Sequence, residues 1–304
     1  MNLRDLEYVT AIDRYRNFGR AADACHVSQP SLSAQVKKLE ARLGVDLFVR
    51  SSSGVVTTNA GMRIVATAKE VLRHAQRITD TAAEYHDPLA APLRIGIIPT
   101  LAPFVLPYLD TCIASVADDL KAMYREFPTE VLLAELDNRT IDVALLSGPI
   151  DLPGFNFTPI FREPFTLMVA DGHRVSNQNS IAADAIPHEE MFLLTKEHCL
   201  HNETTRLCTD KNIGVDVPAE MHASNLLTLA HFLKPEIGCA LVPALANDII
   251  SKSNPRMHFI QIEDEAYGRD IGFVSRKGCP RDHILQALCQ RIRAAAPEGI
   301  TALD

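Results

Sequence analysis

Apolar residues near the start of the chain recur with the period of α-helices. The first predicted helix has an apolar residue at every third position, at Leu3, Leu6, Val9 and Ile12. Small residues over 19–25 predict a second helix that another helix can approach closely. In a third helix the apolar spacing is four, three and four residues, at Leu32, Val36, Leu39 and Leu43. Ser28 is placed to cap this helix and Gly44 to end it, and residues 47–58 predict a hairpin, or wing.

A long helix is predicted from about residue 59 to residue 85. Its apolar positions step alternately by four and three residues, at Ile64, Ala68, Val71, Ala75, Ile78, Ala82 and Tyr85. This heptad seam indicates pairing with a second copy of the chain, because an exposed apolar stripe needs a partner. Packing on its own domain is the alternative, and the lack of a neighbouring helical segment favours the dimer.

Beyond a proline-marked boundary at 87–92, short apolar runs alternate with helical stretches. The predicted strands and helices include 94–98, 104–113, 130–136, 143–146, 226–232 and 239–242, with a new cycle starting at Phe165. Such alternation predicts parallel sheets covered on both faces. The expected fold class is multidomain α/β, in which two small lobes enclose a cleft as the default ligand site.

Composition narrows the class of protein. The chain is 47% hydrophobic and 22% charged, has no apolar run long enough to cross a membrane, and starts without an apolar signal segment. We therefore expect a cytoplasmic protein that does not bind membranes, and seven scattered cysteines agree with a reducing compartment. The net charge is −8, but residues 1–88 hold 12 Lys and Arg against 10 Asp and Glu, and the rest hold 18 against 28. This asymmetry is typical of a small nucleic-acid-binding module on an acidic body.

The exposed side of the third predicted helix has the residue types that contact DNA. Amides and hydroxyls bind base edges in the major groove, and basic side chains bind phosphate. The candidate contacts, including one in the first helix and one in the wing, are Gln29, Pro30, Ser31, Ser33, Lys37, Arg4 and Arg50. An ordinary solvated helix face is the alternative. The order of small helix, turn, capped helix, wing and long helix favours a recognition helix.

Two runs in this region resemble the winged helix-turn-helix of LysR-type transcription regulators. They span residues 18–33 and 38–48, and the similarity continues through 58–61. The resemblance implies promoter double-stranded DNA and RNA polymerase as partners, a homodimer formed through the linker helix, and a homotetramer. It also implies a two-lobed regulatory domain similar to periplasmic binding proteins. The expected domains are 1–58 (winged helix-turn-helix), 59–88 (linker helix) and 89–304 (regulatory domain), with lobe I at about 92–163 and 269–304 and lobe II at about 164–268.

The segment 198–208 combines cysteines with basic residues. A thiol reacts with peroxide as the thiolate, which nearby positive charge or a helix N-terminus stabilises. The basic residues that could supply this positive charge near Cys199 are Lys196, His198, His201 and Arg206. A sulfenic acid on Cys199 would condense with a resolving thiol, for which Cys208 is the nearest candidate. In one continuous helix the two cysteines would lie about 13.5 Å apart along the axis. A disulfide needs Cα atoms within roughly 7 Å, so the helix would have to unravel.

Two alternatives remain for this segment. In the first, both cysteines are inert buried thiols. In the second, they form a zinc site with His198 and His201, although the spacing matches no common zinc pattern. Of the other cysteines, Cys279 is expected to be exposed, and four are expected to be buried hydrophobic residues: Cys25, Cys112, Cys239 and Cys289.

Over nearly its whole length the chain is also similar to the OxyR-type peroxide sensors within the LysR family. The similar segments are 4–8, 25–30, 95–100 and 198–208. This resemblance implies that Cys199 is the peroxidatic cysteine and that Cys208 resolves it. It further implies a peroxide pocket formed by Thr100, Thr129 and His198. After Leu200 the subgroup usually has Arg-Asp, whereas His201 and Asn202 stand here, so we expect a different peroxide sensitivity.

The predicted function is therefore a thiol-switched regulator of oxidative-stress genes, with no enzyme activity, cofactor or metal. The alternative is a LysR-type regulator controlled by a small molecule in the inter-lobe cleft, with the cysteines incidental. An enzyme such as a thiol peroxidase would leave the recognition helix and the heptad seam unexplained.

Overall fold

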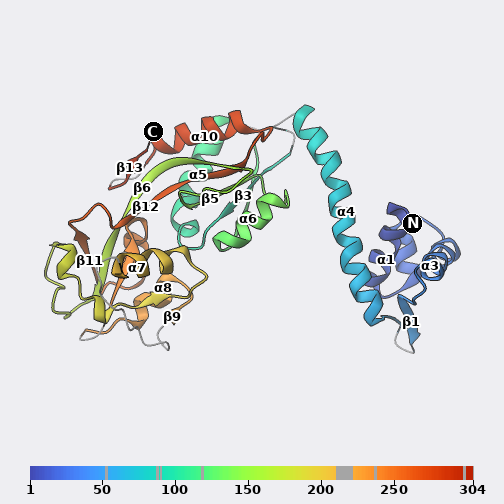
Figure 1. Ribbon diagram of the computed structural model, residues 1–304, viewed down its shortest axis with the longest axis horizontal. Coiled ribbons are helices and arrows are strands. Elements are labelled where there is room, and N and C mark those ends of the chain that lie inside the picture. Colours follow the sequence, from blue (N-terminus) through green and yellow to red (C-terminus); the bar gives the residue numbers. More distant parts are fainter. Residues whose placement is uncertain are drawn as a thin grey trace. The chain divides into compact units, whose positions relative to one another are not determined.

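The computed structural model describes residues 1–51, 54–86, 89, 91–117, 120–209, 222–235, 238–296 and 299–303. The chain divides into two compact units, Met1–His86 and Asp87–Asp304. Figure 1 shows the helices and strands of each.

The first unit is a winged helix-turn-helix that continues into a long helix. Its elements are α1 (Leu3–Tyr15), α2 (Phe18–Ala24), α3 (Gln29–Leu43), β1 (Phe48–Ser51), β2 (Gly54–Thr57) and α4 (Asn59–His86). The Ser28 hydroxyl accepts a hydrogen bond from the Ser31 N–H at the start of α3. Gly44 ends α3 in the left-handed conformation, with φ 70°. The predicted helices, both caps of α3 and the hairpin are therefore confirmed.

The first part of α4 belongs to the core of this unit. Val65 and Ala68 are buried in the same apolar cluster as Val9 and Ile12 of α1. The expectation that α4 has no helical neighbour is wrong for these turns, because α1 covers them. Further along the seam, Ile78 is 76% exposed. Among the side chains that the structure describes in the second half of α4, the seam residues Ile78 and Ala82 are exposed.

The second unit is built on a nine-stranded mixed sheet with the order β4-β3-β5-β12-β6-β11-β7, in which β10 and β13 also pair with β6. These strands are β3 (Leu93–Ile97), β4 (Ala122–Glu126), β5 (Val143–Gly148), β6 (Phe155–Ala170), β7 (Ser180–Ile181), β10 (Cys239–Pro243), β11 (Met257–Ile262), β12 (Gly268–Arg276) and β13 (Thr301–Ala302). A separate two-stranded sheet joins β8 (Leu193–Leu194) to β9 (His222–Ala223). The helices are α5 (Ala102–Val116), α6 (Thr129–Asp137), α7 (Cys199–Thr209), α8 (Leu226–Phe232), α9 (Asn247–Ser253) and α10 (Asp282–Ala294).

The expected all-parallel sheets are wrong for the middle of this unit. Only β3 with β4, β3 with β5, and β11 with β7 pair in parallel within the nine strands that the structure describes, whereas β6 pairs antiparallel with each of its neighbours. The strand predicted to start at Phe165 in fact starts at Phe155 and runs for 16 residues. Pro164 lies within this strand, opposite Gly268.

Two apolar cores lie along this continuous sheet. Phe161 of β6 packs in a core with β3, β5 and α10, and Met168, seven residues later, packs in a second core with β10 and β11. The unit therefore has two lobes that share β6. We call them lobe I, which contains β3, β5 and α10, and lobe II, which contains α7, α8 and β11.

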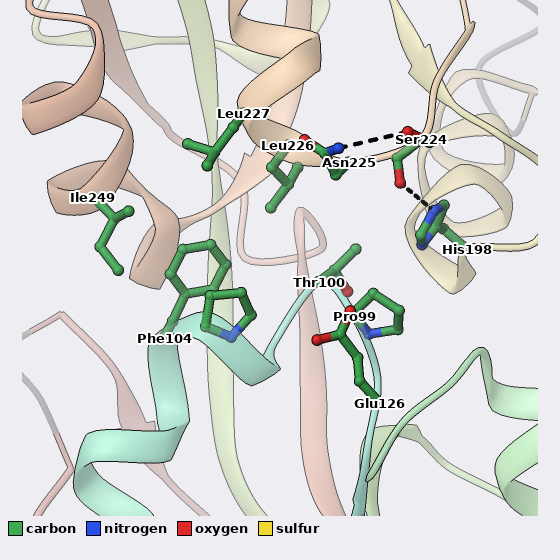
Figure 2. Close-up of a pocket in the computed structure, with 11 residues that line it drawn as sticks. Pro99, Thr100, Phe104, Glu126, His198, Ser224, Asn225, Leu226, Leu227 and Ile249 are labelled. Atoms are coloured by element: carbon green, nitrogen blue, oxygen red, sulfur yellow. Dashed lines mark hydrogen bonds between the residues drawn. The ribbon is translucent and has the colours of Figure 1, made fainter. Parts of the chain in front are cut away.

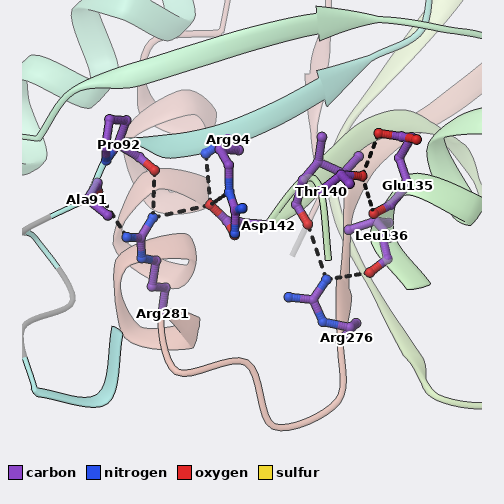
Figure 3. A network of polar contacts seen from close by, with 10 residues as sticks. Ala91, Pro92, Arg94, Glu135, Leu136, Thr140, Asp142, Arg276 and Arg281 are labelled. Atoms are coloured by element: carbon purple, nitrogen blue, oxygen red, sulfur yellow. Dashed lines mark hydrogen bonds and ion pairs between the residues drawn. The ribbon is translucent and has the colours of Figure 1, made fainter. Parts of the chain in front are cut away.

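A buried polar network fixes the point where the chain enters lobe I (Figure 3). The Asp142 carboxylate, 2% exposed, accepts hydrogen bonds from the side chains of Arg94 and Arg281. Arg281 also donates to the carbonyl oxygens of Ala91, at 2.9 Å, and Pro92, at 3.0 Å. Ala91 and Pro92 are thus held by the Arg281 guanidinium, which also forms a buried ion pair with Asp142.

Within the described parts of the chain, no helix combines the length and the apolar character that a membrane span requires.

Candidate functional site

The polar face of α3 is available for contacts. Gln29, Ser31 and Lys37 are exposed, and Ser33 is half-buried beside the apolar stripe. Pro30 occupies the first turn, where a missing N–H costs no hydrogen bond. The helix therefore presents an amide, a hydroxyl and an ammonium group on one surface, as a recognition helix requires.

The two predicted arginine contacts lie outside α3. Arg4 is exposed in the first turn of α1. Arg50 contributes its backbone to the wing, opposite Val55, and its side chain lies outside the described residues. Both assignments to phosphate stay predictions.

Cys199 is the first residue of α7 and is half-buried. The Thr100 side chain and the Leu200 backbone N–H lie close enough to its sulfur to lower the pKa of the thiol. Thr100 follows β3 at the edge of lobe I and is 2% exposed. The thiol therefore lies at the N-terminus of a helix in lobe II, in contact with a buried residue of lobe I.

Arg269 of β12 is the cation of this site, and sequence analysis did not identify it. It is 2% exposed and forms an ion pair of 2.8 Å with Glu163, which stands directly opposite on β6. Its Nη1 donates to the Thr100 hydroxyl at 2.8 Å and its Nη2 to the Thr100 carbonyl at 3.0 Å. A buried guanidinium thus holds the hydroxyl that contacts the Cys199 sulfur.

The expected source of positive charge is corrected by the structure. Lys196 and Arg206 are exposed, and the His201 ring hydrogen-bonds to the Leu194 carbonyl. Burial raises the pKa of the Cys199 thiol, and the Glu203 carboxylate raises it further. Arg269 lowers that pKa without reversing the net shift. The surroundings of Cys199 therefore disfavour its thiolate form on balance.

A cavity of about 420 Å³ opens between lobe I and lobe II beside this site (Figure 2). Thr100 and His198 line it, together with apolar side chains such as Phe104 and Leu226. His198 is 7% exposed, and its Nε2 donates to the Ser224 carbonyl at 2.9 Å. In this tautomer Nδ1 is an acceptor, and it is buried with no hydrogen-bond partner in the part of the chain that the structure describes.

Thr129 is not brought to this cavity. It is the first residue of α6, and no described residue forms a hydrogen bond with its buried hydroxyl. Thr100, His198 and Cys199 are thus adjacent, and a role for Thr129 in a peroxide pocket stays a prediction.

The backbone of α7 includes both Cys199 and Cys208. With a rise of about 1.5 Å per residue, a continuous helix separates their Cα atoms by about 13.5 Å along the axis. The side chain of Cys208 lies outside the described residues. This helical form cannot contain a disulfide between the two, because the Cα atoms of a disulfide lie within roughly 7 Å of each other.

The other cysteines mostly follow expectation. Cys112, Cys239 and Cys289 are buried and Cys25 is half-buried. Cys279, expected to be exposed, is only 8% exposed, because it packs in the apolar core of lobe I. Among the described residues no three His, Cys, Asp or Glu side chains are grouped to hold a metal, and the zinc alternative stays open because it includes Cys208.

Comparison with known proteins agrees with this architecture. Residues 3–62 match the family "Bacterial regulatory helix-turn-helix protein, lysR family", and residues 86–297 match the family "LysR substrate binding domain". The DNA-binding transcriptional dual regulator OxyR of Escherichia coli (strain K12) is 35% identical over 97% of this chain and 95% of its own length. The hydrogen peroxide-inducible genes activator of Haemophilus influenzae is 31% identical over 100% of this chain and 98% of its own length.

Solved structures of related proteins are also similar. A Corynebacterium glutamicum OxyR mutant with hydrogen peroxide bound has a TM-score of 0.65 and 30% identity, covering 97% of this chain and 92% of that one. A full-length OxyR mutant from Pseudomonas aeruginosa has a TM-score of 0.62 and 30% identity, covering 96% of this chain and 95% of that one.

Proposed function

The chain belongs to the LysR family of bacterial helix-turn-helix regulators, and on this premise we propose that it is a DNA-binding transcription regulator that senses hydrogen peroxide through Cys199. One observation carries the sensing role. The Cys199 thiol lies at a helix N-terminus, in contact with Thr100 and within the field of Arg269, beside a cavity that solvent can enter. An incidental buried cysteine needs none of these groups.

The chemistry balances with peroxide as the oxidant. The Cys199 thiolate attacks one peroxide oxygen, so that an S–O bond forms, the O–O bond breaks, and the leaving hydroxide takes a proton to become water. Thr100 and the free acceptor of His198 are placed to orient peroxide in the cavity. The sulfenic acid then reacts with the Cys208 thiol, which forms a disulfide and releases a second water.

Closing this disulfide changes the backbone of lobe II. Because α7 holds the two cysteines about 13.5 Å apart, the helix must unravel before they meet. The polar residues 202–205 are the stretch that yields. Loss of α7 also removes the contact between Cys199 and lobe I, so oxidation alters how the two lobes are held together.

The remaining partners follow from the family. We propose a cytoplasmic homodimer formed through the exposed seam of α4, assembled into a homotetramer on promoter DNA, and contact with RNA polymerase. Ile78, 76% exposed on this seam, supports the dimer, since monomeric proteins rarely expose a row of apolar residues.

The cavity also favours a second candidate function. Its volume of about 420 Å³ exceeds the space for one peroxide molecule, since a water molecule occupies roughly 30 Å³. Leu226, Leu227 and Ile249 give it an apolar side. The alternative is therefore a regulator that binds a small organic effector between the lobes.

Footprinting of promoter DNA with and without peroxide distinguishes the two. Cys199→Ser should bind DNA, yet its footprint should not change when peroxide is added. Cys112→Ala is the control, because Cys112 is buried in the core of lobe I, and it should respond like the unmodified protein. A Cys199→Ser footprint that still responds to peroxide would refute sensing through this thiol.

A further inference from the structure

Glu203 is a carboxylate beside the sensor thiol that the proposed chemistry does not use. It follows Cys199 by four residues on α7, so the two side chains lie on the same face of the helix. The Ser147 hydroxyl of β5 donates a hydrogen bond to its Oε1. Its Oε2 is buried and has no hydrogen-bond partner among the described residues. One oxygen of the carboxylate is thus fixed by a hydrogen bond, and the other has none from the described residues.

Two carboxylates share one guanidinium at this site. Arg269 is already paired with Glu163, which is 0% exposed and also accepts a hydrogen bond from the Leu245 N–H. Glu203 acts on Arg269, Glu163 and Cys199 through its charge. The adjacent His198 donates to the Ser224 carbonyl through Nε2. The groups around the thiol are therefore one guanidinium, two carboxyl groups and one imidazole.

We propose that Glu203 sets the peroxide threshold of the sensor by holding a negative charge beside the Cys199 thiol. A carboxylate four residues away on the same face of the helix disfavours the thiolate, which is the form that attacks peroxide. Oxidation is thereby slowed until peroxide accumulates. Glu203 is a tuning residue, since it acts through Cys199 and is not required for bond formation. The inference rests on the proposed peroxide-sensing function.

Glu203→Gln tests this, because the amide oxygen can still accept the hydrogen bond from Ser147. Each unit by which a thiol pKa falls raises the thiolate fraction at pH 7 about tenfold and lowers its intrinsic reactivity about threefold. The full-length variant should therefore lose its Cys199 thiol to excess hydrogen peroxide faster at pH 7, by about threefold for each unit of that fall. Its pH–rate profile should move towards acid.

Two further variants keep the result interpretable. Glu189→Gln removes a carboxylate from lobe II that is 69% exposed and pairs with Arg174, and it should leave the profile unchanged. Glu203→Leu removes the same charge by another route and should move the profile in the same direction, even if Glu203→Gln folds poorly. A slower Glu203→Gln, or a profile in the original position, overturns the inference. Failure of peroxide to oxidise Cys199 in the unmodified protein would instead overturn the proposed function.

Discussion

Arg269 pairs with the buried Glu163 carboxylate and also favours the Cys199 thiolate. Its removal should therefore lower both the stability of the protein and the reactivity of the thiol, and a second substitution separates the two effects. Arg269→Met leaves the Glu163 carboxylate buried with only the Leu245 N–H as a donor. Breaking a buried ion pair by removing one partner costs about 3–5 kcal/mol. For a unit of this size, that corresponds to a fall in melting temperature of roughly 6–20 °C.

The double variant Arg269→Met/Glu163→Gln should recover at least half of that loss, because no unpaired charge remains in the sheet. Both variants lack the guanidinium that favours the Cys199 thiolate. Both should therefore react with peroxide more slowly than the unmodified protein, despite their different stabilities.

The stability of Arg269→Met should also depend on pH. Burial raises the pKa of Glu163, and loss of the guanidinium raises it further. In the unfolded chain a glutamate carboxyl has a pKa of about 4.3. When its pKa in the folded state is higher, the carboxyl contributes its full stability at pH values below the unfolded pKa. It loses this contribution as the pH rises through the folded-state pKa. The deficit relative to the unmodified protein should therefore be smaller at pH 5 than at pH 8. Differential scanning calorimetry measures all three proteins. A single variant that melts within about 2 °C of the unmodified protein would refute the reasoning.

Three further predictions concern other parts of the molecule. Lys37→Ala should weaken DNA binding about equally on all sequences and reduce the slope of log K against log salt by about one, measured by fluorescence anisotropy; an unchanged slope would exclude a phosphate contact. Ile78→Glu should shift the chain from dimer towards monomer in sedimentation velocity without lowering the melting temperature, because the side chain is 76% exposed, and an unchanged mass would place the interface elsewhere. Arg281→Met should destabilise the regulatory unit by about 1–3 kcal/mol in urea unfolding, since the Ala91 and Pro92 carbonyls lose their donor while Asp142 keeps Arg94; a change below about 0.5 kcal/mol would show that the network is not structural.

The first unit could be predicted closely because its signals are local. The apolar spacing of α3, the Ser28 cap and the left-handed Gly44 all act within a few residues of the element they define. The mixed sheet could not be predicted, because its antiparallel pairs depend on register between segments far apart in the sequence. The strand predicted to start at Phe165 begins ten residues earlier, at Phe155.

The sensor site shows the same division. Cys199 and His198 could be proposed from the sequence, because their chemistry and neighbours are local. Arg269 and Glu163 are 106 residues apart and meet only because the register of β12 on β6 places them opposite each other. Arg269 stands beside Asp270 in a strand that also contains Arg276, so its charge alone did not mark it as a site residue and could not reveal the partner. Glu203 stood at a visible i+4 spacing, but its effect on the thiol depends on the buried charges around it.

The central claim is that peroxide joins Cys199 to Cys208, and peptide mapping tests it most directly. Trypsin cleaves after Lys196, Arg206 and Lys211, so the two cysteines fall in separate peptides, 197–206 and 207–211. After one equivalent of peroxide and alkylation of free thiols, these two peptides should be found joined by a disulfide and should separate on reduction. If both are recovered alkylated from DNA-bound protein whose footprint has already changed, the thiol switch is contradicted.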